Sequence, residues 1–151
     1  MSYTGVNGGL VICVADDPAM HSSQNEQDSR HYAIAAKVPM LEPADSAEAL
    51  LFAREAFELS ERFDTPVMLR MCTRIAHSQS LVEFGERADT AKKPYVKNPQ
   101  KYIMMPAYAK KKHPEVEART AAIAEFAAES ALNRVERGTD AAIGIITSGT
   151  S

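Results

Sequence analysis

The chain has 151 residues and an apolar fraction of 45%, so it is long enough for one packed domain and is not globally disordered. Its formal net charge of −3 predicts no general attraction to nucleic acid or to an anionic membrane. No apolar run of about 18 residues and no secretory leader pattern is present, and we expect a cytoplasmic protein. Cys13 and Cys72 are too few to ligate an iron–sulfur cluster alone.

The N-terminal part of the chain begins as a buried strand. Residues 10–15 form a continuous apolar run led by β-branched side chains, which is typical of a central parallel strand covered on both faces. A short helix that is capped by Asp28 or Ser29 and reaches Lys37 is expected next, followed by a short strand over residues 38–41.

A βαβ unit follows. The run Asp45-Ser46-Ala47-Glu48 is a capping box, and it predicts a helix over residues 46–63 that ends at Asp64-Thr65-Pro66. Residues 66–73 are predicted to form the next strand. A strand, a helix and a strand of these lengths predict a parallel sheet, so the fold class is α/β.

The C-terminal part has a different character. Residues 91–113 carry seven lysines and no acidic side chain, and we interpret residues 81–113 as an extended linker. Pro114 is a favoured first-turn residue and predicts a helix within residues 114–140. Residues 141–147 are predicted to form a last strand. The buried face of the predicted helix comprises Val116, Thr120, Ile123, Ala127, Ala131 and Val135.

The segment from Asp16 to Arg30 is a dense polar loop directly after the first strand. In open parallel α/β sheets, ligands bind beyond the carboxyl ends of the strands. His21 can exchange a proton near neutral pH, and Arg30 can hold a carboxylate with a two-point fork. The alternative is a solvated turn in which Asp28 and Ser29 only cap the helix. No spacing of His, Cys, Asp and Glu indicates a metal site.

The order of residues in this loop carries a specific resemblance. The chain closely resembles the large (alpha) subunit of indolepyruvate ferredoxin oxidoreductase, a thiamine-diphosphate-dependent 2-oxoacid oxidoreductase. The strongest match is Met20-His21-Ser22-Ser23-Gln24-Asn25-Glu26-Gln27-Asp28-Ser29-Arg30. The match continues through Tyr3-Thr4-Gly5-Val6-Asn7-Gly8-Gly9, Ala15-Asp16-Asp17-Pro18, Val38-Pro39-Met40-Leu41-Glu42-Pro43, Thr73-Arg74-Ile75-Ala76-His77-Ser78, Lys97-Asn98-Pro99 and Gly144-Ile145-Ile146-Thr147-Ser148-Gly149.

The resemblance implies a reaction and a set of partners. The family oxidatively decarboxylates arylpyruvates such as indolepyruvate to an aryl-acetyl-CoA, with coenzyme A and ferredoxin as co-substrates. Thiamine diphosphate, Mg2+ and 4Fe–4S clusters serve the intact enzyme, which also contains a beta subunit. Contacts with nucleic acid or membranes are not implied.

The resemblance also implies a division of the chain. Residues 1–80 are similar to the C-terminal half of the pyrimidine-type thiamine-diphosphate-binding domain. Residues 81–113 correspond to a lysine-rich linker and residues 114–140 to a connecting helix. Residues 141–151 are similar to the first strand of a transketolase-C-like domain. The chain is thus expected to be a fragment, or a small subunit that completes a larger one.

The resemblance assigns site roles within the polar loop. The catalytic candidates are His21, Gln24 and Arg30, with Arg30 directed toward the 2-oxoacid carboxylate. The cofactor-binding candidates are Ser22, Ser23, Asn25, Glu26 and Gln27. The family's activating glutamate, its Gly-Asp-Gly motif and its cysteine clusters are not in this sequence, so we expect no metal ligands here and an inactive isolated chain.

Three alternatives stay open. The first is another 2-oxoacid:ferredoxin oxidoreductase with a different substrate. The second is a non-catalytic truncated remnant that only binds a partner subunit. The third is a nucleotide- or phosphate-binding module that uses the lysine-rich segment. Arg70, Arg74 and His77 follow or end the third predicted strand, and we interpret them as contacts with a neighbouring domain or a partner subunit.

Overall fold

A parallel sheet of three strands forms the centre of the protein. The structure is a computed structural model that describes residues 1–87 and 89–150, so one position of the predicted linker and the last position of the predicted C-terminal strand segment lie outside the described residues. The strands are β1 (Val11–Asp16), β2 (Met40–Leu41) and β3 (Val67–Cys72), in the spatial order β1-β3-β2. The expected α/β class and parallel sheet are therefore confirmed.

The position of β1 corrects one expectation. The central strand is β3, which pairs with β1 along six residues and with β2 along two. β1 instead lies at an edge of this sheet, and Cys13 in its middle is exposed. An apolar run shows that a strand has apolar neighbours, but it does not determine which strand has neighbours on both sides.

The helices of the N-terminal part lie where the sequence placed them. α1 (Arg30–Ala36) ends at Lys37 in a left-handed conformation, and α2 (Ser46–Phe63) has the predicted bounds. The Asp45 carboxylate accepts from the Glu48 amide at 2.9 Å, and the Glu48 side chain accepts from the Ala44 amide at 2.8 Å. The first bond satisfies a first-turn amide that the helix leaves without a partner, and the second holds the chain that leads into the helix.

A small apolar core joins α2 to the sheet. Ala56, Leu59 and Val67 are its buried centre, and Phe63 packs against Phe126 with ring centroids 5.6 Å apart. The buried Ser60 hydroxyl donates to the Thr65 carbonyl at 2.7 Å and accepts from the Leu10 amide at 2.9 Å. This hydroxyl thus ties the end of α2 to the start of β1.

The C-terminal part departs from its predicted elements. The long helix is α5 (Pro106–Glu129), which begins eight residues before Pro114 and ends before Val135. The expected extended linker over residues 81–113 agrees with the described residues of 81–98, which form no regular structure and are mostly exposed. It is wrong at α4 (Pro99–Tyr102) and at the start of α5. Pro106 occupies the first turn of the helix, the position that the sequence interpretation gave to Pro114.

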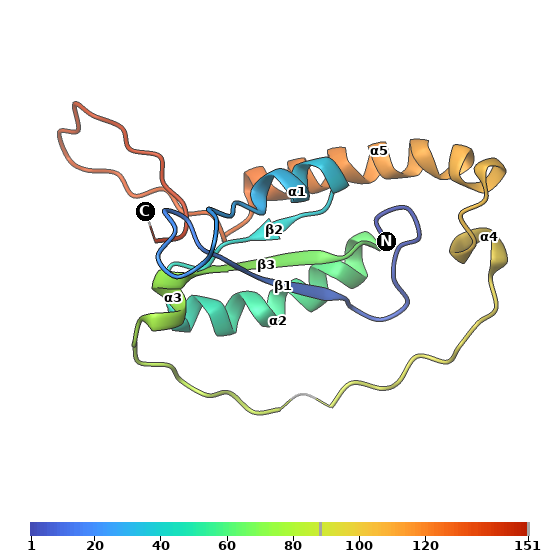
Figure 1. Ribbon diagram of the computed structural model, residues 1–151, viewed down its shortest axis with the longest axis horizontal. Helices are drawn as coiled ribbons and strands as arrows, with labels where there is room; N and C mark the ends of the chain where they lie inside the picture. Colours follow the sequence, from blue (N-terminus) through green and yellow to red (C-terminus); the bar gives the residue numbers. More distant parts are fainter. Residues whose placement is uncertain (88, 151) are drawn as a thin grey trace.

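The last predicted strand does not form. The described residues 141–147 have no strand structure, and Ile145 and Ile146 are largely exposed. A strand needs a neighbour for its backbone hydrogen bonds, and none of the three described strands runs beside this segment (Figure 1). Figure 1 also shows α1 and α5 side by side near β2, whereas α2 crosses on the β1 side.

Candidate functional site

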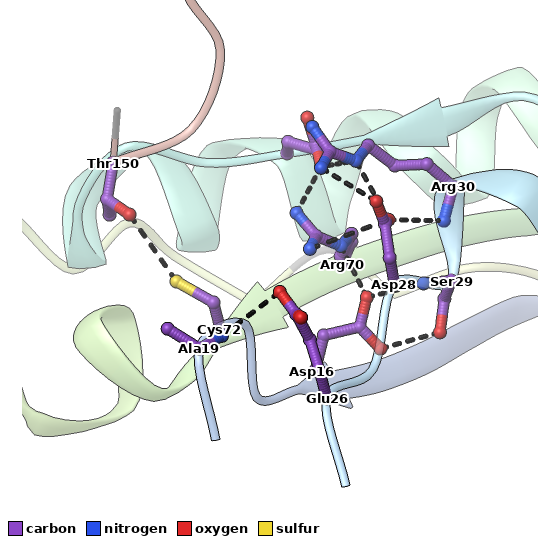
Figure 2. Close-up of polar contacts among 10 residues, drawn as sticks. Asp16, Ala19, Glu26, Asp28, Ser29, Arg30, Arg70, Cys72 and Thr150 are labelled. Carbon is purple, nitrogen blue, oxygen red and sulfur yellow. Dashed lines mark hydrogen bonds and ion pairs between the residues drawn. The ribbon is translucent and has the colours of Figure 1, made fainter. Parts of the chain in front are cut away.

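Charged side chains meet at the carboxyl ends of β1 and β3. Arg70, on β3, donates from Nε to Asp16 at the end of β1 and from Nη1 to Glu42 just after β2, both at 2.5 Å. Ser29 donates to the other Asp16 oxygen from its hydroxyl at 2.6 Å (Figure 2). The Arg70 and Asp16 side chains are only 10% and 3% exposed. The parallel register places these groups together because it aligns the ends of β1 and β3.

This cluster keeps its members charged. Burial acts to raise the pKa of Asp16, but the hydrogen bonds from Ser29 and Arg70 outweigh it and hold that pKa below its ordinary value. Burial acts to lower the pKa of Arg70, but Asp16 and Glu42 raise it overall. Asp16 and Arg70 are therefore held in their ionised forms as a buried pair.

Asp17 organises the loop that follows. Its carboxylate accepts from the backbone amides of His21, Ser22 and Ser23 at 2.7–3.0 Å. The Thr73 hydroxyl donates to it at 2.6 Å, which links the loop to the end of β3. The Thr73 hydroxyl and the Ser22 amide are the main causes that place the pKa of Asp17 well below its ordinary value. A single ionised side chain thus fixes the loop backbone.

The loop presents its side chains outward. Ala19 and Met20 have positive φ angles of 65° and 56°, a conformation that residues other than glycine seldom adopt and that turns the chain sharply. His21 and Gln24 are exposed, and neither side chain has a partner among the described residues. A backbone held by Asp17 with unengaged polar side chains is suited to recognition of a ligand.

The cofactor-binding candidates divide into two groups. Glu26 accepts from the Ala19 amide at 3.2 Å, and Asn25 contacts the Glu26 carbonyl at 3.4 Å, so both support the loop. The side chains of Ser22, Ser23 and Gln27 have no partner within the described part of the chain.

Arg30 is paired in this structure. Its Nε and Nη2 atoms donate to the two oxygens of Asp28, each at 2.8 Å, as a two-point fork (Figure 2). Arg30 is the main cause that lowers the pKa of Asp28 well below its ordinary value. The remaining nitrogen, Nη1, has no partner among the described residues, so it is available to another acceptor.

For several residues of the charged cluster at the strand ends, the sequence had indicated other roles than the contacts that the structure shows. The sequence placed Asp16 and Asp17 in the polar loop after the first strand and Asp28 as a possible helix cap, while Glu42 had no role. Arg70 was placed in a contact with a neighbouring domain or a partner subunit, and in the structure it pairs within its own chain. The sequence does show an ionisable residue near the end of each strand. It does not show that these ends are neighbours, because the β1-β3-β2 order belongs to the tertiary structure. Arg74 and His77 are exposed on α3 (Thr73–His77), and their side chains have no polar partner among the described residues.

The described residues contain no metal-binding cluster and no membrane-spanning helix. No group of three or more His, Cys, Asp or Glu side chains among residues 1–87 and 89–150 is arranged to hold a metal ion. No helix of that same part is long and apolar enough to cross a bilayer.

Three lysines of the lysine-rich segment form ion pairs within the chain. Lys93 pairs with Glu61, Lys101 with Asp64 and Lys112 with Glu115.

The fold and the strand-end network define an α/β protein with a polar candidate site at the carboxyl edge of a parallel sheet. Comparison with known proteins shows that essentially every residue of this chain aligns with one part of indolepyruvate oxidoreductase subunit IorA, so the two are homologous there. It is 45% identical over 151 residues to IorA of Methanothermobacter marburgensis and 44% identical over 150 residues to IorA of Methanothermobacter thermautotrophicus. It is 41% identical over 157 aligned residues to IorA of Pyrococcus horikoshii.

The relationship covers one part of those subunits. The alignments take in 98–100% of this chain but only 24% of each of these three relatives. The chain therefore spans about a quarter of the length of the curated relatives that it matches. No family model matches the chain, and no solved structure matches it.

Proposed function

We propose that this chain forms one wall of the active site of a 2-oxoacid oxidoreductase that acts on arylpyruvates such as indolepyruvate. In the overall reaction, the bond between the carboxyl and carbonyl carbons breaks and carbon dioxide leaves. The acyl group forms a thioester with coenzyme A, and the electron pair is passed singly to ferredoxin. The rest of the site then comes from other domains and from a beta subunit.

The observation that carries the proposal is the loop held by Asp17. Its backbone is fixed by three amide bonds to one carboxylate, while His21 and Gln24 project without partners in the described chain. It lies at the strand ends, where open parallel sheets bind ligands. The homology to subunits named for indolepyruvate supports the choice of substrate.

The described residues fit only part of thiamine diphosphate, the cofactor that the relationship implies. A diphosphate group needs free cationic or amide donors, but Arg70 is fully paired and Asp16, Asp17 and Glu42 make the strand ends acidic. The hydroxyl, amide and imidazole groups of Ser22, Gln24 and His21 fit a neutral hydrogen-bonding ring or a substrate carbonyl. When bound, thiamine diphosphate supplies carbanion stabilisation, and its diphosphate and Mg2+ belong to another part of the enzyme.

The proposed roles follow from this division. Arg30 directs its free Nη1 toward the carboxylate of the 2-oxoacid, and His21 and Gln24 hydrogen-bond to the carbonyl oxygen or the cofactor ring. Ser22, Ser23 and Gln27 contact the cofactor, and Asn25 and Glu26 keep the loop in shape. Arg30 and Glu42 also border the small cavity beside Arg70, of about 100 Å³.

A co-purification assay tests the proposal. The full chain with an affinity tag is expressed in the organism that encodes it. The proteins that co-purify with it are assayed for coenzyme-A-dependent reduction of a viologen dye. Indolepyruvate, phenylpyruvate, 2-oxoglutarate and pyruvate are supplied in turn. We expect activity with the two arylpyruvates, and a Gln24→Ala variant should capture the same proteins with at least tenfold lower activity. A matched Gln100→Ala variant on α4 should match the unaltered chain.

Other outcomes would assign the chain differently. A strong preference for pyruvate or 2-oxoglutarate would replace the substrate and keep the reaction class. Capture of a partner without any 2-oxoacid activity would contradict the proposal and favour a non-catalytic binding role.

A further inference from the structure

A second, larger cavity lies next to the strand-end network. It has a volume of about 420 Å³ and lies between α1, β2 and α5. Ligand sites for small molecules usually occupy roughly 300–1,000 Å³ and are lined mainly by apolar side chains with a few polar groups. Its apolar lining comes from Ala33, Ile34, Val38, Met40 and Ile123.

The walls of this cavity come from elements that are held together at the surface. Lys37 at the end of α1 forms an ion pair with Glu117 on α5, which bridges the two helices. Val116, one residue earlier on α5, is fully buried, so the helix is packed down at this point. Ala33 is buried on the facing side of α1, and its small side chain leaves the space open.

Arg30 connects the apolar cavity to the polar site. Both this cavity and the smaller one beside Arg70 are lined by Arg30 and Glu42, so the two spaces adjoin at these side chains. Nη1 of Arg30 makes no hydrogen bond within the described chain, whereas Nε and Nη2 bond to Asp28 and Nε also lies 4.0 Å from Glu42 Oε1. A ligand that joins an apolar ring to a carboxylate matches this arrangement, because the ring enters the apolar space while the carboxylate stays at the arginine.

We propose that the cavity between α1, β2 and α5 receives the aromatic ring of the 2-oxoacid and so determines the preference for arylpyruvates. The proposal rests on the function proposed above, since it names the part of the chain that would select that substrate. Pyruvate has only a methyl group in place of the ring, so it would leave the apolar lining in contact with water and lose the favourable burial.

Nuclear magnetic resonance on the full, unreacted chain tests ring binding directly. The probes are indole-3-acetate, which has ring and carboxylate but no oxo group, indole, which lacks the carboxylate, and pyruvate, which lacks the ring. We expect indole-3-acetate and indole to shift the methyl signals of Ile34, Val38, Met40 and Ile123, and pyruvate to leave them unchanged. Shifts confined to other residues, or no shift with indole-3-acetate, would overturn the proposal.

Variants at one helix supply the matched comparison. Ala33→Leu fills the cavity and should weaken indole-3-acetate binding at least tenfold, whereas Ala35→Leu, at an exposed position of the same helix, should not. If Ala33→Leu does not fold, Ile123→Trp fills the space from α5 and should have the same effect. Arg30→Gln should weaken indole-3-acetate but not indole. Equal binding by the filled-cavity variant and its control would contradict the proposal.

The same variants separate this inference from the proposed function. If a captured complex oxidises indolepyruvate but Ala33→Leu leaves its preference for indolepyruvate over pyruvate unchanged, the cavity assignment fails and the function stands. If indole-3-acetate binds in the cavity while the complex oxidises no 2-oxoacid, the function fails and the ring-binding site stands.

Discussion

Residues 10–77 and the described residues of 78–150 both contain runs of apolar side chains but reach different structures. In the first region every strand has a parallel neighbour, and Leu59, Val67 and Leu69 are buried. In the second region Leu81 and Ile146 are almost completely exposed. The second region contains one long helix, α5, and no strand among its described residues.

The difference shows what each kind of element needs. A helix satisfies its backbone hydrogen bonds within itself, so α5 forms although Val116 is its only buried residue. A strand needs another strand for the same bonds, so residues 141–147 stay irregular although three of them are isoleucines. The charged network of the polar site lies in the region where the strands are paired, and Ser148, Gly149 and Thr150 of the second region also line the small cavity beside Arg70.

The strand-end ion network gives the largest expected effect. Arg70→Met would leave Asp16 and Glu42 without their buried counter-charge, which typically costs about 3–5 kcal/mol of unfolding free energy. Arg74→Met, at an exposed position four residues later, should change it by less than about 0.5 kcal/mol. Urea unfolding at neutral pH measures both. Equal effects would show that the network does not anchor the site.

A pair of leucine truncations compares the two regions directly. Leu59→Ala removes a buried side chain from the core between α2 and the sheet and should cost about 2–5 kcal/mol. Leu81→Ala changes an exposed side chain and should stay within about 0.5 kcal/mol. The thermal midpoints of both variants give the comparison. A large loss from Leu81→Ala would mean that residues near 81 pack onto the protein.

The position at which α5 begins can be tested by whether substitution of Pro114 stabilises or destabilises the chain. Pro114 lies inside the helix, where it lacks the amide for a backbone bond and crowds the preceding turn. Pro114→Ala should therefore stabilise the chain by about 1–3 kcal/mol and increase its helical circular dichroism. A neutral or destabilising change would instead favour a helix that begins at Pro114.

The smallest expected effect concerns the Ser29 hydroxyl and pH. Ser29→Ala removes the hydrogen bond to Asp16 and should cost about 1 kcal/mol at pH 7. The pKa of Asp16 is lowered in the folded chain, so its stabilisation is complete above the unfolded value of about 3.9 and is lost as the pH falls below it. The cost of Ser29→Ala should shrink over the same range.

Ser22→Ala is the control for that titration. The Ser22 hydroxyl has no partner in the described chain, and only its backbone amide contacts Asp17. The variant should have the stability of the unaltered chain at every pH. A pH-independent loss from Ser29→Ala would show that its hydroxyl does not act through Asp16.

Local patterns predicted the parts of the fold that local forces determine. Asp45 and Glu48 indicated the start of α2, and Asp64 ends it in a left-handed conformation, so both bounds were predictable. The start of α5 was not, because Pro106 and Pro114 both fit a first turn and their order of preference depends on what the helix packs against.

The candidate site was predictable as a location but not as a network. The density of polar residues after an apolar run indicated the loop, and its residue order indicated the family. The contacts of Asp16 and Arg70 depend on strands that are far apart in the sequence, so spacing alone did not join them. Whether His21, Gln24 and Arg30 contact a substrate stays a prediction.

A chimeric enzyme gives the most direct test of the central claim, which is that the loop after β1 is a wall of an arylpyruvate site. Residues 1–151 of this chain replace the matching segment of IorA from Methanothermobacter marburgensis, and the complete oxidoreductase is assayed for indolepyruvate turnover. We predict an active chimera whose kcat/KM falls at least tenfold with His21→Ala or Gln24→Ala and is unchanged with Gln100→Ala. An active chimera in which all three variants match the unaltered enzyme would contradict the account.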